Sequence, residues 1–563
     1  MNVSKIKHAV VPLLLLTHFL LGAVTISRLS PTYDEPPHIA SGFAYWKMGE
    51  YRLNILDHPP FAKMFAAVPL LFMKPVLPVH HPSYVNRRQY SFGNLFVYHN
   101  RLDAEKILSA GRIMILILSC LLGLAVFIWA QGIGGYAAGL VSLVLYVFSS
   151  NFIGHGTLVT TDVPLALFYF LSVYCLWRWF RKPTVVHAVL CGAAAGFALG
   201  SKFSGVIIFP VFIVLLILNP SQIKIKFSGL IFHIFVFFCS VFFVMLLLYR
   251  GNSIGLYLDG IEYLSGYMKR GWSTFMAGRH SLSGWRHYFA VTFLLKTPVG
   301  LLALLVLSAV FFRKAAREEK TFLLIPPLVF FAVASFSRIQ IGHRHILPVY
   351  PFLFVWTGYS IKNLYDRKSR LVVSTASAIL LLWYIFSCMS AHPWHLGYFN
   401  EIAGGPANGY KFLTDSNVDW GQGLKELGIW YKKNNPSVIY FSYFGTGDPH
   451  YYGIRYVPVG FVTHVPDEER QGDDIVPGGS ERIFFAVSAT NLQATYYSDR
   501  EVFSFLKGIP PATLPANSIF VYDLTKNPDA LRKLADIFGG FGNVKQMKYL
   551  EMRIKGLKRI GGK

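Results

Sequence analysis

Long apolar runs separated by short polar connections occupy the chain from near its first residue to about position 390. Each run approaches the roughly 17–25 residues that an α-helix needs to cross the hydrocarbon core of a bilayer. The pattern predicts about eleven transmembrane helices, with a margin of one or two because the run at 186–200 is short and rich in Ala and Gly. The runs lie at 8–26, 112–130, 136–150, 163–180, 186–200, 204–219, 228–249, 291–312, 321–336, 345–361 and 371–390.

Basic residues are concentrated in the short connections on one side of the predicted bundle. Cytoplasmic loops carry an excess of Lys and Arg, so we expect this side and the N-terminus to be cytoplasmic. The first run has the basic start of a signal peptide, but its length favours a retained helix. The short connections on the other side carry only Lys202, Arg338 and Arg344. The basic side holds Arg178, Arg181, Lys182, Lys224, Lys226, Arg313, Lys314, Arg317, Lys320, Lys362, Arg367, Lys368 and Arg370.

Three larger polar segments then fall on the extracytoplasmic side, at about 28–110, about 250–290 and after about 391. The last segment alternates strand-like runs with helical stretches, which is typical of an α/β domain. We therefore predict a helical polytopic membrane domain at 1–390, with its main outer loop at about 28–110. An extracytoplasmic α/β domain is predicted at 391–563.

The composition favours a membrane protein and argues against a nucleic-acid-binding one. Of the 563 residues, 53% are hydrophobic and only 15% are charged, which is more apolar surface than a soluble core buries. The net charge of +24 includes many Lys and Arg beside the apolar runs, a placement typical of topology signals. The five Cys residues lie within or at the edge of apolar runs without metal-ligand spacing, so no zinc–thiolate site is expected.

The first candidate for chemistry is the acidic pair Asp34 and Glu35, which follows the first span among several prolines. Acidic residues in the first turn of a helix also act as caps and interact favourably with its dipole, so a structural role is the alternative. A general base requires a carboxylate held near an acceptor hydroxyl. Asp57, His58 and Lys63 follow in the same loop and add an acid, an imidazole and an amine, which favours the catalytic interpretation.

A second group of polar residues is expected at the same outer edge of the membrane. His155 and Asp162 lie between the third and fourth spans, while Lys202 and the adjacent Arg344 and His345 lie at outer span ends. Asp162 is also placed to cap the following helix, and Lys or Arg at such positions commonly extend to the lipid interface. Alternatively, the cations together neutralise a phosphate at the headgroup level.

These residues resemble the motifs of the GT-C superfamily of membrane glycosyltransferases, in the branch of protein-O-mannosyltransferases and aminoarabinose transferases. The chain looks most like bacterial phospholipid-carrier-dependent glycosyltransferases, from its start to about residue 430. The acidic pair in the first outer loop is the most specific feature, and His345 stands where the family often has Tyr. The matching stretches are Asp34-Glu35, His58-Pro59-Pro60, His155 through Asp162-Val163-Pro164, Gly200-Ser201-Lys202, Gly342-His343-Arg344-His345, Tyr398-Phe399-Asn400-Glu401 and Asp415 through Gln422.

The resemblance implies a GT-C type fold and transfer of a sugar from a polyprenyl-phosphate donor to a hydroxyl outside the membrane, with inversion at the anomeric carbon. The acceptor is a glycan, a lipid or a protein, as in the wider family. Asp34 is the implied general base, with Glu35 beside it. The candidates at the donor phosphate are Lys202, Arg344, His58 and Lys63, and those that contact substrate are His155, Asp162 and His345.

The resemblance leaves metal dependence open, because some family members bind a divalent cation at the acidic motif and others do not. Asp34, Glu35, His155 and Asp162 are the candidate ligands, and no other cofactor is expected. The sequence contains no Walker-type loop or dinucleotide fingerprint, and no nucleic acid partner is expected. We expect a multi-pass protein of the inner (plasma) membrane, with the active site and the C-terminal domain periplasmic.

A polytopic transporter or a flippase for the lipid carrier is the competing interpretation, since it also requires many spans and intramembrane charges. The charged residues gather at one outer edge and not at mid-membrane, which favours an enzyme. Large outer segments point the same way. A non-catalytic scaffold is a third alternative, but it needs no acidic pair.

The predicted orientation is tested by site-specific topology tags. We expect the inner tags to report cytoplasm and the outer tags to report the exterior, because the basic connections all fall on one side. An exterior signal from two of the inner tags would place Asp34 in the cytoplasm and overturn the site assignment. The inner tags are at Lys182, Lys314 and Lys368, and the outer tags are at Ser83, Gly278 and Asp474.

Overall fold

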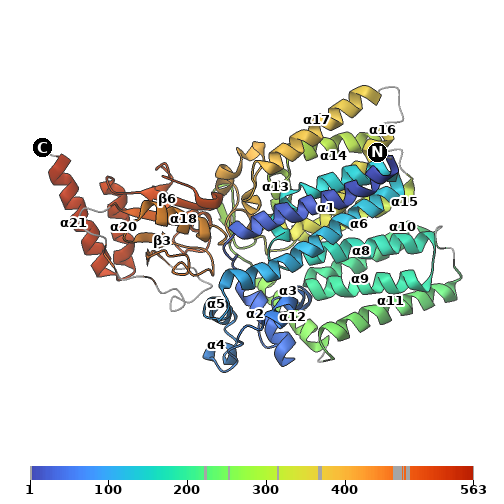
Figure 1. The fold of residues 1–563 in the computed structure, drawn as a ribbon, viewed down its shortest axis with the longest axis horizontal. Helices are drawn as coiled ribbons and strands as arrows, with labels where there is room; N and C mark the ends of the chain where they lie inside the picture. Colours follow the sequence, from blue (N-terminus) through green and yellow to red (C-terminus); the bar gives the residue numbers. More distant parts are fainter. Residues whose placement is uncertain are drawn as a thin grey trace.

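A bundle of long helices forms one part of the molecule, and a smaller part that contains a sheet lies at one end of it (Figure 1). This arrangement confirms the predicted class of a helical polytopic protein with a C-terminal α/β part. The structure is a computed structural model. It describes residues 3–220, 223, 225–251, 254–312, 316–364, 370–460, 472, 475–476 and 482–561.

Helices occupy the ranges predicted as spans. Five helices in the described part of the chain are long and apolar enough to cross a membrane, or six if α13 and α14, which meet at 109°, form one broken span. The total of about eleven spans stays a prediction. The bundle helices are α1 (Val3–Arg28), α6 (Ala104–Val147), α8 (Asp162–Arg181), α9 (Val185–Ser201), α10 (Ile208–Leu218), α11 (Phe227–Leu248), α13 (Tyr288–Lys296), α14 (Val299–Phe312), α15 (Arg317–Ser335), α16 (Tyr350–Leu364) and α17 (Arg370–Met389).

The long helix α6 combines two of the predicted spans. Its backbone leaves the helical conformation at Gly135, where φ is 79° and ψ is 179°. This region is open almost only to glycine, because a Cβ atom clashes there. Beyond it the chain folds back, so that Tyr146 donates a hydrogen bond to the carbonyl of Ser119 at 2.7 Å. The two arms of α6 are therefore antiparallel, as two separate spans require.

Apolar side chains cover the outer surface of the bundle. On α11, Phe235, Phe242 and Phe243 are all exposed, and only 17% of the residues in its most apolar 18-residue stretch are buried inside the protein. Such a surface is stable against hydrocarbon but not against water. The chain is accordingly an integral membrane protein.

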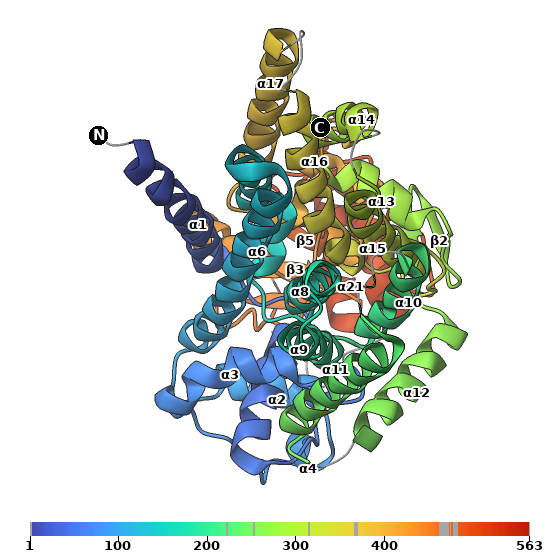
Figure 2. The ribbon, with the colours of Figure 1, turned by 90° about the vertical axis from the view of Figure 1, so that its right-hand side faces the viewer.

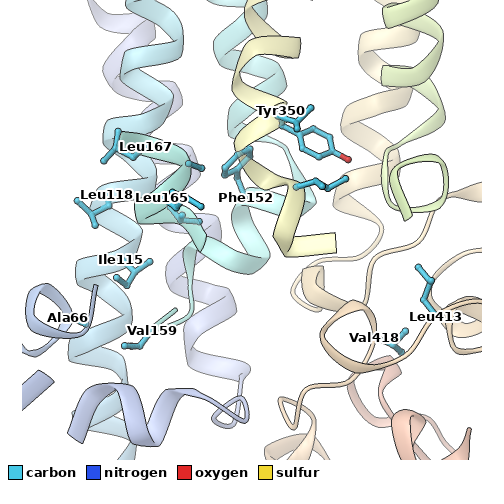
Figure 3. Close-up of a cluster of buried hydrophobic side chains, with 14 of the residues drawn as sticks. Ala66, Ile115, Leu118, Phe152, Val159, Leu165, Leu167, Tyr350, Leu413 and Val418 are labelled. Carbon is cyan, nitrogen blue, oxygen red and sulfur yellow. The ribbon is translucent and has the colours of Figure 1, made fainter. Parts of the chain in front are cut away.

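Inside the bundle, α6, α8 and α16 meet in an apolar core (Figure 3). Leu118, Leu165 and Phe152 belong to this core, and Val159 belongs to the same cluster. Helix α1 joins the bundle through His18, whose ring nitrogens lie 2.9 Å from Ser119 Oγ and from the Val147 carbonyl. The core thus holds the loop after α7 (Ser150–Gly156), which carries site residues.

The predicted outer loop is built of short helices. Helices α2 and α3 lie side by side below α6, as Figure 2 shows along the length of the bundle. Helix α3 packs against α2 and α6, and its buried residues include Ala66, Ala67 and Leu70. The short outer elements are α2 (Glu35–Met48), α3 (Phe61–Met73), α4 (Pro82–Val85), α5 (Gln89–Tyr98), α12 (Ile254–Arg270), β1 (Thr274–Met276) and β2 (Arg279–Ser281).

The C-terminal part contains a four-stranded sheet with the strand order β4-β3-β5-β6. Strand β3 is parallel to β4 and β5, and β6 is antiparallel to β5, with Phe485 opposite Tyr522. All four strands fall within the predicted C-terminal domain, whose boundaries stay a prediction. The elements are α18 (Leu424–Asn434), β3 (Ile439–Ser442), β4 (Tyr456–Pro458), β5 (Phe484–Ser488), α19 (Ala489–Leu492), β6 (Ile519–Asp523), α20 (Pro528–Gly540) and α21 (Val544–Gly561).

The connections of the bundle are sorted between its two ends. The N-terminus and the connection between α8 and α9 lie at the end farthest from the sheet, whereas α2 to α5 lie at the end nearer to it (Figure 1). This separation agrees with the division expected from the basic residues. Five of those basic residues and three tag positions lie outside the described residues, and Lys314 and Lys368 belong to both groups: Lys224, Arg313, Lys314, Arg367, Lys368 and Asp474.

Candidate active site

Asp34 lies at the sheet end of the bundle, between α1 and α2. It occupies the N-cap position of α2, but its side chain makes no capping hydrogen bond. The carboxylate is 18% exposed and lies 3.7 Å from Nη1 of Arg344. The capping role considered from the sequence is therefore wrong for this side chain, which faces a cation instead.

The neighbouring Glu35 has a different environment, because it is fully buried in an ion pair with Arg112 of α6. Arg112 donates two hydrogen bonds to this carboxylate, at 2.8 and 2.7 Å. The backbone N–H groups of Thr32 and Val159 donate two more, at 2.8 and 2.9 Å. Burial raises the pKa of Glu35, but Arg112 and the hydrogen bonds outweigh it and hold the pKa below its ordinary value.

These contacts give Glu35 a structural environment and correct the expectation that it acts beside Asp34. Each oxygen of the Glu35 carboxylate already accepts two hydrogen bonds from within the protein, so the group has no acceptor capacity left for a substrate. It fastens the start of α2 to α6 and to the loop at Val159. Asp34 is therefore the member of the pair that remains available for chemistry.

Two cations converge on Asp162, the first residue of α8. Nζ of Lys202 lies 2.6 Å from one carboxylate oxygen, and Nη1 of Arg344 lies 3.5 Å from the other. Because Arg344 also lies near Asp34, the four charged groups form a continuous cluster. The structure thus brings together four residues that the sequence placed at one membrane edge.

Arg344 is held in place by the segment from Asp415 to Gln422. Its Nε donates to Ser416 Oγ at 3.1 Å, and its guanidinium carbon lies 4.0 Å from the ring centre of Trp420. The backbone N–H of Tyr33 in turn donates to the Trp420 carbonyl at 2.8 Å. This segment therefore connects Arg344 with the loop that carries Asp34, which explains a motif whose role the sequence left unstated.

His155 and His345 lie in the same electrostatic neighbourhood. His155 is buried, and no described residue hydrogen-bonds its Nδ1. Burial is the largest influence on the pKa of His155 and lowers it to about 3, which keeps the ring neutral at physiological pH. His345 packs on Phe289, with ring centres 6.2 Å apart. Both interact electrostatically with Asp162, and their contact with a substrate stays a prediction.

Lys63 is bonded to the backbone of His58, and its contacts differ from those expected of a residue at the donor phosphate. Lys63 is completely buried, and its Nζ donates to the carbonyls of Asn54 and His58 at 2.7 Å each. It also bonds Tyr45 and the Asn54 side chain, at 3.2 Å each. Lys63 therefore braces its own loop, and the expectation that it binds phosphate is corrected. His58 lies beside His38, with ring centres 5.1 Å apart.

Burial dominates the ionisation of the acidic groups around Arg344. It raises the pKa of Asp34 above its ordinary value, while Arg344 and Lys202 oppose that rise. Burial also raises the pKa of Asp415 to about 6, although Tyr496 donates a hydrogen bond to its carboxylate. A carboxylate with a raised pKa is a stronger base than an ordinary aspartate while it stays ionised.

The four candidate metal ligands do not form a cation site. Glu35 is bound by Arg112, and Asp162 is bound by Lys202. In the part of the chain that the structure describes, no three His, Cys, Asp or Glu side chains are grouped as metal ligands. The positions that a divalent cation would take beside Asp162 face protein cations instead, so these residues do not suit a resident metal.

Three contributors to the site were missed from the sequence: Arg112, Trp420 and His38. Arg112 is a charged residue at the first position of a predicted span, and such a charge indicates a buried partner. Trp420 lies within the motif that ends at Gln422, but nothing in the motif shows which residue it supports. His38 follows Asp34 by one helical turn, a spacing that places both on one helix face.

Comparison with known proteins supports the resemblance. Residues 105–249 match the family described as dolichyl-phosphate-mannose-protein mannosyltransferase, which confirms the similarity expected from the sequence. The matched stretch contains Asp162 and Lys202 but neither Asp34 nor Arg344. No curated protein matches the chain in sequence.

Several solved structures are similar to this chain at low sequence identity. ArnT from Cupriavidus metallidurans, in the apo state, is 12% identical, with a TM-score of 0.49 over 91% of this chain and 97% of that one. The same protein bound to undecaprenyl phosphate is 12% identical, with a TM-score of 0.47 over the same shares. The oligosaccharyltransferase of Archaeoglobus fulgidus in the apo form is 11% identical, with a TM-score of 0.43 over 76% of this chain and 58% of that one.

The buried ion pair generates a stability prediction. Arg112→Met leaves the Glu35 carboxylate buried without its cation, which typically costs about 3–5 kcal/mol. We expect a clearly lower thermal unfolding temperature in detergent, with Arg112→Lys in between because it keeps the charge but not the paired hydrogen bonds. Unchanged unfolding of Arg112→Met would contradict the structural role of Glu35.

Proposed function

We propose that this protein is a glycosyltransferase that moves a sugar from a polyprenyl-phosphate donor to an acceptor hydroxyl of a glycan, lipid or protein. The reaction takes place on the periplasmic face of the inner membrane. The observation that carries the proposal is the partly exposed carboxylate of Asp34 beside Arg344, with Lys202 joined to them through Asp162. A base and two cations are the groups that such a transfer requires.

The proposed step begins with removal of a proton from the acceptor hydroxyl by a carboxylate oxygen of Asp34. The acceptor oxygen forms a bond to the anomeric carbon as the bond from that carbon to the phosphate oxygen breaks. The departing polyprenyl phosphate keeps the electron pair of the broken bond. Positive charge develops on the sugar and negative charge on the phosphate, and attack from the side opposite the phosphate inverts the anomeric configuration.

Lys202 and Arg344 are suited to stabilise the departing phosphate. Lys202 is 13% exposed, and Asp162 is the one described partner of its ammonium group, which has three N–H donors. Arg344 is held through Nε and Nη1, and no described residue accepts a hydrogen bond from its Nη2. Both side chains therefore keep donors for a phosphate after their contacts within the protein are made.

His58 is retained as a third group at the phosphate, and Lys63 is not. Burial lowers the pKa of His58 well below its ordinary value, with further lowering by His38 and Lys202, so the ring is neutral. A neutral imidazole donates one hydrogen bond without adding charge. The phosphate therefore receives its positive charge from Lys202 and Arg344.

Asp34→Asn tests the proposed base. The substitution keeps the shape of the side chain, so the protein should fold, but transfer should fall by roughly 10²–10⁴-fold. In the wild type, the rate should rise with pH as Asp34 loses its proton and be lost as pH falls through its pKa. Because burial raises that pKa, the midpoint should lie above about 3.9, the value of an ordinary aspartate.

The measurement is the rate of product formation by pure protein, with a panel of polyprenyl-phosphate sugars and with mass spectrometry to identify the product. Asp34→Glu is the matched control, since it keeps the carboxylate and should retain more activity than Asp34→Asn. Near-normal turnover by Asp34→Asn would remove Asp34 as the base.

Lys202→Met tests the proposed phosphate contact. Loss of a charge-assisted hydrogen bond costs about 1.5–3 kcal/mol, so use of the donor should weaken by roughly ten- to hundredfold with every acceptor. Arg344→Gln should act in the same direction. Arg338→Gln is the control, because Arg338 is an exposed cation at the outer edge that bonds the Lys269 carbonyl instead of this cluster.

The contact of Lys202 with the donor phosphate is tested by measuring transfer rates against donor concentration in matched detergent. Identical curves for Lys202→Met and wild type would remove Lys202 from the site. If the wild type yields no glycosylated product with any donor but moves the lipid carrier across vesicles, the protein is a transporter and the proposed function is wrong.

A further inference from the structure

His38 has a buried ring nitrogen that no described residue hydrogen-bonds. The residue is 2% exposed and follows Asp34 by one turn of α2. Its backbone N–H donates to the backbone carbonyl of Asp34 at 3.1 Å. Its Nδ1 lies 2.8 Å from the carbonyl of Val159. A carbonyl only accepts, so Nδ1 carries the hydrogen and Nε2 keeps a lone pair.

No described residue hydrogen-bonds this Nε2 atom. A buried polar atom without a partner is unfavourable, so it needs an explanation such as a bound ligand or a water molecule. Burial is the largest influence on the pKa of His38 and lowers it to about 3, and the nearby Lys63 lowers it further. The ring therefore stays neutral, and Nε2 remains an acceptor at physiological pH.

Other unpartnered polar atoms come from the loop to which His38 is bonded. They are buried, and no described residue hydrogen-bonds them. This loop includes Val159 and leads directly to Asp162, so the unpartnered atoms adjoin the charged cluster of the site. Grouping of this kind indicates one polar ligand with several hydroxyl groups. The atoms are His155 Nδ1, Thr160 Oγ1 and Thr161 Oγ1.

The position of His38 indicates whether its ligand is the acceptor hydroxyl or a hydroxyl of the donor sugar. Asp34 is partly exposed, so an acceptor hydroxyl reaches it from outside. His38 lies one turn further along α2, is almost completely buried and interacts electrostatically with Arg344 and Asp162. A group bound to Nε2 therefore lies deeper in the protein than the exposed part of Asp34, within the electrostatic influence of Arg344. The donor sugar meets both requirements, because it carries hydroxyl groups and is joined to the phosphate that Arg344 and Lys202 are proposed to bind.

We propose that Nε2 of His38 accepts a hydrogen bond from a hydroxyl group of the donor sugar and thereby orients the sugar beside Asp34. The proposal rests on the proposed function, since it assigns a sugar-binding residue to the same site. The bond between Nδ1 and Val159 holds the imidazole ring in the orientation that this contact requires.

Two substitutions of His38 separate the two ring nitrogens. His38→Asn keeps an amide N–H near the position of Nδ1, so it retains the bond to Val159 but lacks the acceptor at Nε2. His38→Gln reaches the position of Nε2 with an amide that accepts, but it loses the bond to Val159. A purely structural histidine therefore tolerates Asn better, whereas a sugar-binding histidine tolerates Gln better.

The first readout is transfer with the polyprenyl-phosphate sugars of the panel. We expect His38→Asn to use the donor roughly ten- to hundredfold less well, and His38→Gln to keep more of the wild-type efficiency. A donor in which the contacted hydroxyl is replaced by hydrogen should be a poor substrate for the wild type. That deoxy donor should show no further loss in His38→Asn, because the contact is already absent.

The second readout does not depend on transfer. The thermal unfolding temperature is measured with sugar-bearing polyprenyl phosphate and with sugar-free polyprenyl phosphate. The sugar should add stabilisation in the wild type, less of it in His38→Asn, and sugar-free polyprenyl phosphate should stabilise both proteins equally.

Each contrary outcome is specific. Equal behaviour of His38→Asn and wild type in both readouts would overturn the proposal, as expected if Nε2 only holds a water molecule. A larger defect in His38→Gln than in His38→Asn would also overturn it and leave a structural histidine. If the wild type transfers nothing but sugar-dependent stabilisation is lost in His38→Asn, the transferase function fails and the sugar contact stands.

Discussion

The site depends on one buried ion pair, that between Glu35 and Arg112. It fixes the first turn of α2 against α6, and the same carboxylate binds the backbone at Thr32 and Val159. Asp34 is the adjacent residue, so its backbone has little freedom to move. A buried pair of this kind is weak evidence for net stability, because desolvation offsets the attraction between the charges. Its value here is positional, since it holds the proposed base Asp34 in place without using the hydrogen bonds of the Asp34 carboxylate.

A second constraint comes from a part of the chain that is distant in sequence. The segment from Asp415 to Gln422 supports Arg344 through Ser416 and Trp420 and also bonds the loop before Asp34. Lys296 strengthens this connection, because its Nζ donates to the Asn417 carbonyl at 2.6 Å. Asp34, the proposed base, and Arg344 are therefore positioned together by residues that follow the last bundle helix, which makes the start of the C-terminal part a structural component of the site.

The sequence predicts the helices and the outer-edge cluster well, since apolar runs and charges at their ends depend on local patterns. Asp34, Asp162, Lys202 and Arg344 meet as expected. Which charges satisfy one another inside the protein was not predictable in the same way. Lys63 was expected at the phosphate, but its ammonium group donates to carbonyls of its own loop. A buried ammonium group is stable only when its hydrogens are bonded to acceptors. That outcome depends on tertiary contacts that no spacing in the sequence specifies.

The distinction between satisfied and unsatisfied polar atoms then sorts the site residues into two groups. Glu35 and Lys63 bond only within the protein, so a substrate has nothing to gain from them. His38 and His155 are also buried, but each keeps a ring nitrogen that no described residue hydrogen-bonds. Burial alone therefore does not separate structural from functional polar residues. At this site, what separates them is whether an atom still has bonding capacity for a substrate, and the ring nitrogens of His38 and His155 that keep such capacity interact electrostatically with Asp162.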